Sequence, residues 1–214
     1  MPTHGAALPA GNASTLRSLA TTLVETLLPA AAQAADKDPT PPPAAPPVRV
    51  RIKTTAGAFT IQVNVARAPL TAANFLQYAH DGFYEGTIIH RIVEGFLIQG
   101  GGFLPDYSLK PTRPSIPNES GNGLSNVRGT VGLARSDDPY SGNSQFFINL
   151  ADNAMLDPQA TRWGYTVFGT VVEGMESLEQ MSHVATGTGD GKAGPLTNSV
   201  PIKQIVIQKV EVLP

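Results

Sequence analysis

The chain has 214 residues, of which 41% are hydrophobic and 15% are charged, and this composition is typical of a globular domain with a real core. Its formal net charge of -2 provides no basic field for a polyanion, so a nucleic-acid partner is not expected. Because the chain contains no cysteine, disulfides, thiolate nucleophiles and cysteine-ligated zinc are excluded.

The N-terminal part differs in composition from the rest. Residues 36–47 read DKDPTPPPAAPP and predict an extended linker, since proline interrupts helices and central strands. Within residues 1–35, Arg17 precedes an apolar run and then AAAQAA, a pattern typical of a secretory signal peptide, although Glu25 interrupts the run. A disordered tail and a mis-assigned start codon are the alternatives. Residues 48–214 are expected to form the folded domain, and no stretch has the ~18 to 20 apolar residues of a membrane span.

The pattern of the expected domain is mainly β. Alternating apolar and polar residues at 48–54 and 59–65, around an Ala-Gly turn, predict a hairpin. A helix is predicted from Pro69 to the Asp-Gly pair at 81–82, because its apolar residues share one face. Further strands are predicted at 86–92, 96–99, 129–134, 145–149, 165–172 and 202–212. With a second short helix after Gly174, this count favours a β-barrel or sandwich whose open ends are closed by helices.

The segment IIHRIVEGFLIQGGGF places polar side chains among apolar ones. His90 and Glu94 have a metal-compatible spacing only on a helix, whereas their β-branched neighbours predict a strand and a packed histidine. Ser144 does not lie in a G-x-S-x-G elbow. The glycine-rich runs at 100–102 and 187–194 lack the G-K-[ST] ending of a phosphate loop, so flexible or close-packed loops are predicted there. No metal or cofactor is expected.

What remains is Arg91, an arginine in an apolar neighbourhood without a base, nucleophile or metal. Its segment resembles the signature of cyclophilins, the peptidyl-prolyl cis-trans isomerases. GTVGLARSDDPYSGNSQFFINLADNAMLD (129–157) and WGYTVFGTVVEGMESLEQM (163–181) are similar to the next two blocks of that family, in the same order. Their form resembles the periplasmic branch of bacterial cyclophilins. The resemblance implies a mainly β fold, a closed eight-stranded antiparallel β-barrel capped by two α-helices.

The resemblance also implies a function. The expected activity is acceleration of rotation about X-Pro peptide bonds, which assists the folding of proline-containing unfolded or partly folded polypeptides. The chain is expected to act as a monomer in the periplasm, with the cytoplasm as the alternative. A proline-segment binding module or holdase chaperone that uses the same groove without turnover is the alternative function.

Individual positions receive roles from the resemblance. Arg91 corresponds to the catalytic arginine, and Gln99 to the glutamine that positions it. The implied apolar seat for the proline ring comprises Phe96, Leu97, Phe147 and Leu156. Further substrate-side positions are His90, Ala134, Arg135, Gln145, Met155 and Tyr165, with Ala134 and Arg135 acting through their backbone. Met155 stands where many eukaryotic members carry tryptophan, so weak or no cyclosporin binding is expected.

Overall fold

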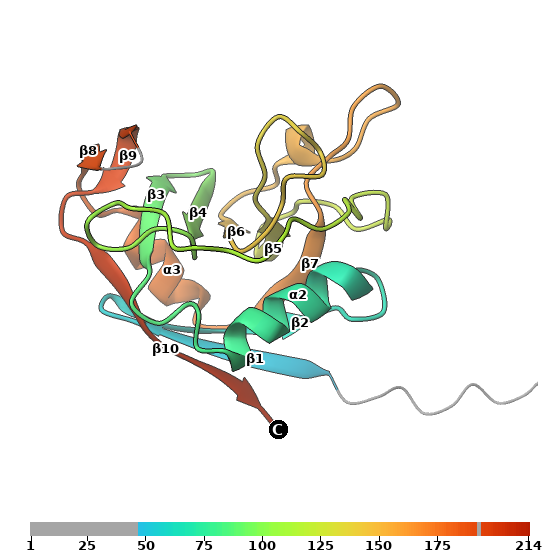
Figure 1. Cartoon of the computed structure of the whole chain (residues 1–214), viewed down its shortest axis with the longest axis horizontal. Helices are drawn as coiled ribbons and strands as arrows, with labels where there is room; N and C mark the ends of the chain where they lie inside the picture. Colours follow the sequence, from blue (N-terminus) through green and yellow to red (C-terminus); the bar gives the residue numbers. More distant parts are fainter. Residues whose placement is uncertain (1–46, 192–193) are drawn as a thin grey trace, which may run out of the picture. The chain divides into compact units, whose positions relative to one another are not determined.

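The computed structural model of the chain describes residues 47–191 and 194–214. The signal-like segment 1–35 and residues 36–46 of the expected linker lie outside the described residues. In chain order, the elements in Figure 1 are β1 (Val48–Thr54), β2 (Gly57–Val63), α2 (Pro69–His80), β3 (Ile88–Val93), β4 (Leu97–Gly100), β5 (Thr130–Leu133), β6 (Phe146–Asn149), the 3-10 helix η1 (Ala154–Leu156), β7 (Val167–Glu173), α3 (Met175–Ser182), β8 (Thr186–Gly191), β9 (Gly194–Pro201) and β10 (Ile205–Leu213). None of the helices in the described part is long and apolar enough to cross a membrane.

Within the described residues, eight strands close a barrel in the order β1-β10-β3-β4-β6-β5-β7-β2, which confirms the predicted barrel and rules out the sandwich. Every pair in the ring is antiparallel. The alternation in β1 shows why this sequence forms a barrel wall: Val50 and Ile52 are buried, whereas Arg49, Arg51 and Lys53 face outward. The first hairpin closes where the Thr54 hydroxyl donates to the Gly57 carbonyl over 2.9 Å.

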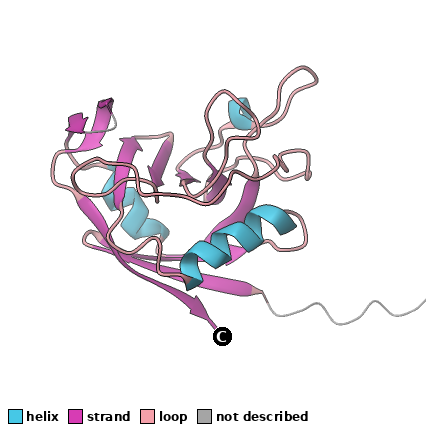
Figure 2. Ribbon diagram, viewed as in Figure 1, coloured by secondary structure: helices cyan, strands magenta, loops and turns pink. Residues whose placement is uncertain are grey.

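The two predicted helices are confirmed and lie against the barrel (Figure 2). Helix α2 begins with Pro69 in its first turn and is followed by Gly82 in the left-handed conformation, φ 64°. It buries Phe75, whose ring centroid lies 5.0 Å from that of Phe168 inside the barrel. Helix α3 likewise buries Leu178. Burial of these apolar side chains, rather than helix propensity, holds both helices in place.

The glycine-rich segment after α3 differs from its prediction as a loop. Strands β8 and β9 form a separate two-stranded sheet, with Gly187 opposite Val200. A Cβ at Gly189 would approach both the Tyr107 ring and a methyl of Val200 within 3.3 Å. Glycine therefore serves close packing here, and the pairing across the hairpin outweighs its low strand propensity.

Candidate active site

The arginine singled out by the sequence lies on β3, and its nearest polar neighbour lies on β4. Arg91 and Gln99 are directly paired across the two strands. The Nη1 of Arg91 donates to Oε1 of Gln99 over 3.3 Å, and both side chains are half-buried. Because the pair is built on strands of a closed barrel, the guanidinium starts from a rigid base.

A second amide extends this arrangement to the next strand of the ring. Gln99 Nε2 donates to Oε1 of Gln145 over 3.0 Å, and Gln99 is also the direct partner of Phe147 on β6. The acceptor oxygen of Gln99 faces the guanidinium and its donor nitrogen faces the second glutamine. The orientation of the Gln99 amide is thus fixed from both sides.

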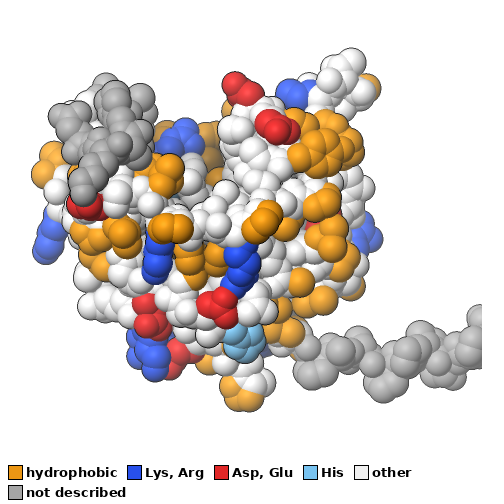
Figure 3. All heavy atoms as spheres, viewed as in Figure 1, with side chains coloured by type: hydrophobic (Ala, Val, Ile, Leu, Met, Phe, Trp, Pro, Cys, Tyr) orange, Lys and Arg blue, Asp and Glu red, His pale blue; other side chains and the backbone are white. Residues whose placement is uncertain are grey.

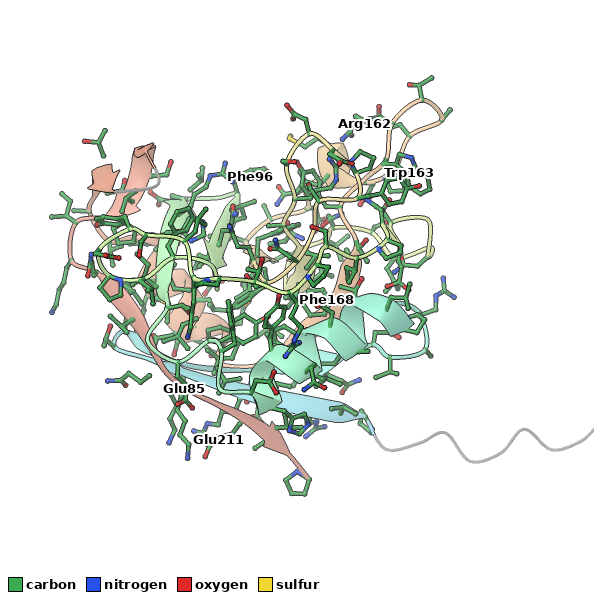
Figure 4. All side chains as sticks on the ribbon, in the orientation of Figure 1. Glu85, Phe96, Arg162, Trp163, Phe168 and Glu211 are labelled. Carbon is green, nitrogen blue, oxygen red and sulfur yellow. The ribbon has the colours of Figure 1, made fainter. Side chains whose placement is uncertain are left out.

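Arg91 and Gln99 border a cavity of about 250 Å³. Nine residues line it: Arg91, Phe96, Leu97, Gln99, Ala134, Arg135, Phe147, Leu156 and Tyr165. Leu97 and Phe147 are buried and form its apolar floor, whereas Phe96 is half-exposed in the β3–β4 turn. In Figure 4, Phe96 projects at the end of the barrel at which the loop of Arg162 and Trp163 protrudes. The cavity therefore combines two arginines, Arg91 and Arg135, with an apolar seat.

A second arginine, Arg135, contacts Tyr165 and the loop that carries it. The Tyr165 ring meets the Phe147 ring edge to face, with centroids 5.8 Å apart. The Arg135 guanidinium carbon lies 4.4 Å from the Tyr165 ring centroid, and its Nη2 donates to the Trp163 carbonyl over 2.8 Å. Arg135 also donates through Nε to the Gly164 carbonyl. Its side chain thus contacts the loop of Tyr165 in three places, beyond the backbone role that the sequence implies.

Three residues with an implied substrate-side role do not line this cavity: Gln145, His90 and Met155. His90 lies on β3 where the pairing with β4 shifts register between Ile89 and Arg91; it is 4% exposed, and its ring lies 4.6 Å from that of Phe103. Burial lowers the pKa of His90 to about 4. A hydrogen bond with the Ile88 backbone raises this pKa, and the nearby positive charge of Arg91 lowers it further. Met155 is 65% exposed on η1 and is not among the lining residues.

A neighbouring cavity of about 260 Å³ shares part of this lining. It is bordered by Gln99, Ala134, Arg135, Ser136, Ser141, Asn143 and Gln145. The structure therefore brings Gln145 to the site through this second cavity. The sequence reading missed Ser136, Ser141 and Asn143, although their polar loop between two motif segments is a signal that could have found them.

No group of three or more His, Asp or Glu side chains within the described residues comes together in a way that could hold a metal ion. Of the backbone groups expected to hold a peptide, the Ala134 N–H already donates to the Gln145 carbonyl over 2.9 Å. A peptide added alongside this segment must therefore use other backbone groups, such as the Ala134 carbonyl.

Comparison with known proteins places this geometry in a family. The sequence model described as cyclophilin type peptidyl-prolyl cis-trans isomerase/CLD matches residues 49–212. Peptidyl-prolyl cis-trans isomerase A of Dickeya dadantii is 46% identical over 164 residues, which are 77% of this chain and 84% of that protein. Peptidyl-prolyl cis-trans isomerase B of Escherichia coli is 42% identical over 166 residues, 76% of this chain and 98% of that protein.

Solved structures agree with the sequence comparisons. Two crystal structures of a cyclophilin type peptidyl-prolyl cis-trans isomerase from Cryptosporidium parvum superpose with a TM-score of 0.63 and sequence identities of 24% and 25%. They cover 78% of this chain, and 97% and 99% of their own chains. The second was determined in the presence of the dipeptide Ala-Pro.

Proposed function

The chain belongs to the cyclophilin-type peptidyl-prolyl cis-trans isomerases, and we propose that it accelerates rotation about X-Pro bonds by hydrogen bonding of Arg91 to the twisted amide. The observation that carries the mechanism is the placement of the guanidinium at the border of the apolar cavity, within hydrogen-bond distance of Gln99. A nucleophile is not needed, since the reaction breaks no covalent bond.

The chemistry explains why arginine suits this place. The X-Pro bond rotates slowly because the nitrogen lone pair is delocalised into the carbonyl, which raises a barrier of ~18–20 kcal/mol. In the twisted state the proline nitrogen becomes pyramidal and can accept a hydrogen bond that the planar amide cannot. A donor directed at this nitrogen stabilises the transition state more than either ground state, which is the condition for catalysis. Arginine remains protonated and presents its N–H groups in a fixed plane.

The apolar floor supplies the other half of the mechanism. A proline ring seated on Leu97 and Phe147 would be held still while the preceding carbonyl swings. The hydroxyl of Tyr165, which lines the same cavity, would donate to a substrate carbonyl. The partners we propose are proline-containing unfolded or partly folded polypeptides. We propose that this protein binds them as a monomer. The formal net charge of -2 provides no basic field for a nucleic acid, and on the face in Figure 3 basic side chains are interspersed with acidic and apolar ones.

The decisive experiment compares wild type with Arg91→Ala. In a proline-limited refolding assay or a peptide isomerisation assay, we expect kcat/KM to fall by roughly 10²-fold, the usual effect of removing one transition-state donor. Arg51→Ala is the matched control, since Arg51 is exposed on the outer face of β1. Equal rates for wild type and Arg91→Ala would contradict the mechanism. If both proteins bind the peptide but neither accelerates its isomerisation, the result would favour a binding module or holdase.

Weak cyclosporin binding is proposed from the residue at position 155. Met155 is exposed and offers a thioether where an indole would offer an N–H donor. Met155→Trp should lower the cyclosporin concentration needed for half-inhibition, with kcat/KM for peptides unchanged. If wild type is already inhibited as strongly as Met155→Trp, the proposal is wrong.

The location and domain boundaries rest on the sequence. The signal-like composition of residues 1–35 supports export to the periplasm, with 36–47 as linker and 48–214 as the isomerase domain. N-terminal sequencing of the protein from cell fractions tests this: cleavage before the linker in the periplasmic fraction is expected. Intact Met1 in the cytoplasm would refute export.

A further inference from the structure

Behind the apolar cavity lies a chain of buried polar side chains that takes no part in the mechanism above. Asn126, Asn149 and Asn153 are 1%, 0% and 4% exposed. Asn153 Nδ2 donates to Oδ1 of Asn149 over 2.8 Å, and Asn149 Nδ2 donates to Oδ1 of Asn126 over 3.2 Å and to the Thr130 hydroxyl over 2.9 Å. The backbone N–H of Asn126 and its side-chain Nδ2 both donate to Oδ1 of Asp157, over 2.7 and 2.9 Å. We call these four residues, Asn126, Asn149, Asn153 and Asp157, the amide relay.

Two members of the amide relay contact the backbone of cavity residues. Asn153 Nδ2 donates to the carbonyl of Phe96 over 2.9 Å. Asn126 Nδ2 donates to the carbonyl of Tyr165 over 3.3 Å. Between them, the Leu156 N–H donates to the Asn153 carbonyl, and the Tyr165 N–H donates to the Leu156 carbonyl, each over 2.8 Å.

These contacts join segments that are distant in the sequence. Phe96 lies in the β3–β4 turn, whereas Leu156 and Tyr165 belong to the connection between β6 and β7. Tyr165 meets Phe147 only edge to face, a contact that tolerates sliding. Hydrogen bonds are directional, and an unmade hydrogen bond is costly in a buried site. A buried chain of them therefore fixes the distance between the β3–β4 turn and the β6–β7 connection, which apolar contact alone leaves adjustable.

We propose that the amide relay positions the two walls of the proline seat, acting through Phe96 on one side and Leu156 and Tyr165 on the other. This inference rests on the proposed function of the cavity, and it adds to it a separate control of substrate fit. Arg91 is held mainly by its hydrogen bond to Gln99 between β3 and β4, outside the relay; its guanidinium carbon also lies 5.9 Å from the Phe96 ring centroid, at the outer limit of a cation–π contact. Loss of the relay should therefore weaken binding in ground state and transition state alike, which raises KM and leaves kcat within about twofold.

The first test uses the half-buried end of the relay. Asp157→Ala removes the acceptor for Asn126, whereas Asp157→Asn keeps an oxygen at that place. We expect Asp157→Ala to weaken the affinity for a short Ala-Pro peptide and to raise KM by roughly three- to tenfold, the range of one or two hydrogen bonds. Asp157→Asn should restore most of the loss. Equal affinities for the Ala and Asn variants, or a loss confined to kcat, would overturn the proposal.

The second test asks whether the relay acts through Phe96. Asn153→Ala is measured in wild type and in a Phe96→Ala background, and the effect of Asn153→Ala on peptide affinity should be smaller in the second background. An effect of the same size or larger in the Phe96→Ala background would overturn the proposal. Asn122→Ala is the control, because Asn122 Nδ2 also donates to a carbonyl in another segment, that of Val167, but contacts no cavity residue. If Asn153→Ala does not fold, the Asp157 pair alone decides.

Failure of this inference differs from failure of the catalytic mechanism. Peptide affinity, measured for example by NMR titration, needs no turnover, so it tests the relay even if Arg91→Ala retains the wild-type rate. Conversely, a large rate loss in Arg91→Ala combined with equal peptide affinities for Asp157→Ala and Asp157→Asn would keep the mechanism and reject the relay.

Discussion

Arg91 and Gln99 face each other as a direct cross-strand pair, with Nη1 of the first 3.3 Å from Oε1 of the second. The contact is at the long end of the hydrogen-bond range, so it orients the guanidinium without engaging all its N–H groups. Gln99 is held in turn by Gln145 over 3.0 Å. A guanidinium poised in this way keeps donors free for a nitrogen that becomes an acceptor only in the twisted state.

Gln99→Leu should lower kcat/KM by about tenfold, since it removes one hydrogen bond to a charged group, worth ~1.5 kcal/mol. The loss should vanish in an Arg91→Ala background if Gln99 acts through Arg91. Steady-state peptide isomerisation of the two single variants and the double variant measures this coupling. Gln62→Leu, on β2 and outside the cavity, is the control. Additive losses in the double variant would show that Gln99 acts independently of Arg91.

Arg135→Met should loosen the loop that carries Tyr165, because it removes the donors to the Gly164 and Trp163 carbonyls and the cation above the ring. Trp163 is the chain's single tryptophan, so its fluorescence reports on this loop without ambiguity. We expect lower fluorescence anisotropy at Trp163 and a fall in kcat/KM of roughly three- to tenfold. Unchanged anisotropy would show that Arg135 is not the brace of the loop.

The strand pattern predicted a mainly β barrel or sandwich, and the resemblance implied the closed barrel; the reason that the pattern worked is visible in the strands. In β1, strict alternation places Val50 and Ile52 inside and the charged residues outside, so period and burial agree. The glycine-rich hairpin β8–β9 was predicted as a loop because glycine carries no such alternation. A Cβ at Gly189 would lie 3.3 Å from the Tyr107 ring, so the glycine fits against a segment that is distant in the sequence.

The candidate site divides in the same way. Residues on strands of the motif segments, such as Arg91 and Phe147, line the cavity that their resemblance implied. Met155 does not line it: on the 3-10 helix η1 its side chain is 65% exposed, whereas the next residue, Leu156, lines the cavity. The amide relay escaped prediction because a buried asparagine in a sequence looks the same as an exposed one. Asn149 within the buried strand FFIN was its single visible signal.

Acidification should destabilise the fold through His90. Its folded-state pKa of about 4 lies below the ~6.5 of an unfolded chain, so between these values the unfolded state binds the extra proton. The free energy of unfolding should therefore fall as pH decreases from about 6.5 to 4, by up to ~3 kcal/mol from this group. Urea denaturation of wild type and His90→Met at pH 7 and 4.5 measures it. The difference between the two pH values should be smaller in His90→Met, and an equal difference would exclude His90 as the cause.

The last prediction concerns the contact between α2 and the barrel interior. Phe75 is 1% exposed, and its ring lies 5.0 to 5.9 Å from the rings of Phe168, Tyr84 and Phe146. Phe75→Ala should reduce the free energy of unfolding by ~3–5 kcal/mol, because it removes buried apolar area and leaves a cavity among aromatic rings that cannot collapse onto it. Leu70→Ala on the same helix, where the side chain is 49% exposed, should change it by less than about 0.5 kcal/mol. Both values come from urea denaturation of the full chain. A loss below ~1 kcal/mol for Phe75→Ala would mean that α2 adds little to barrel stability.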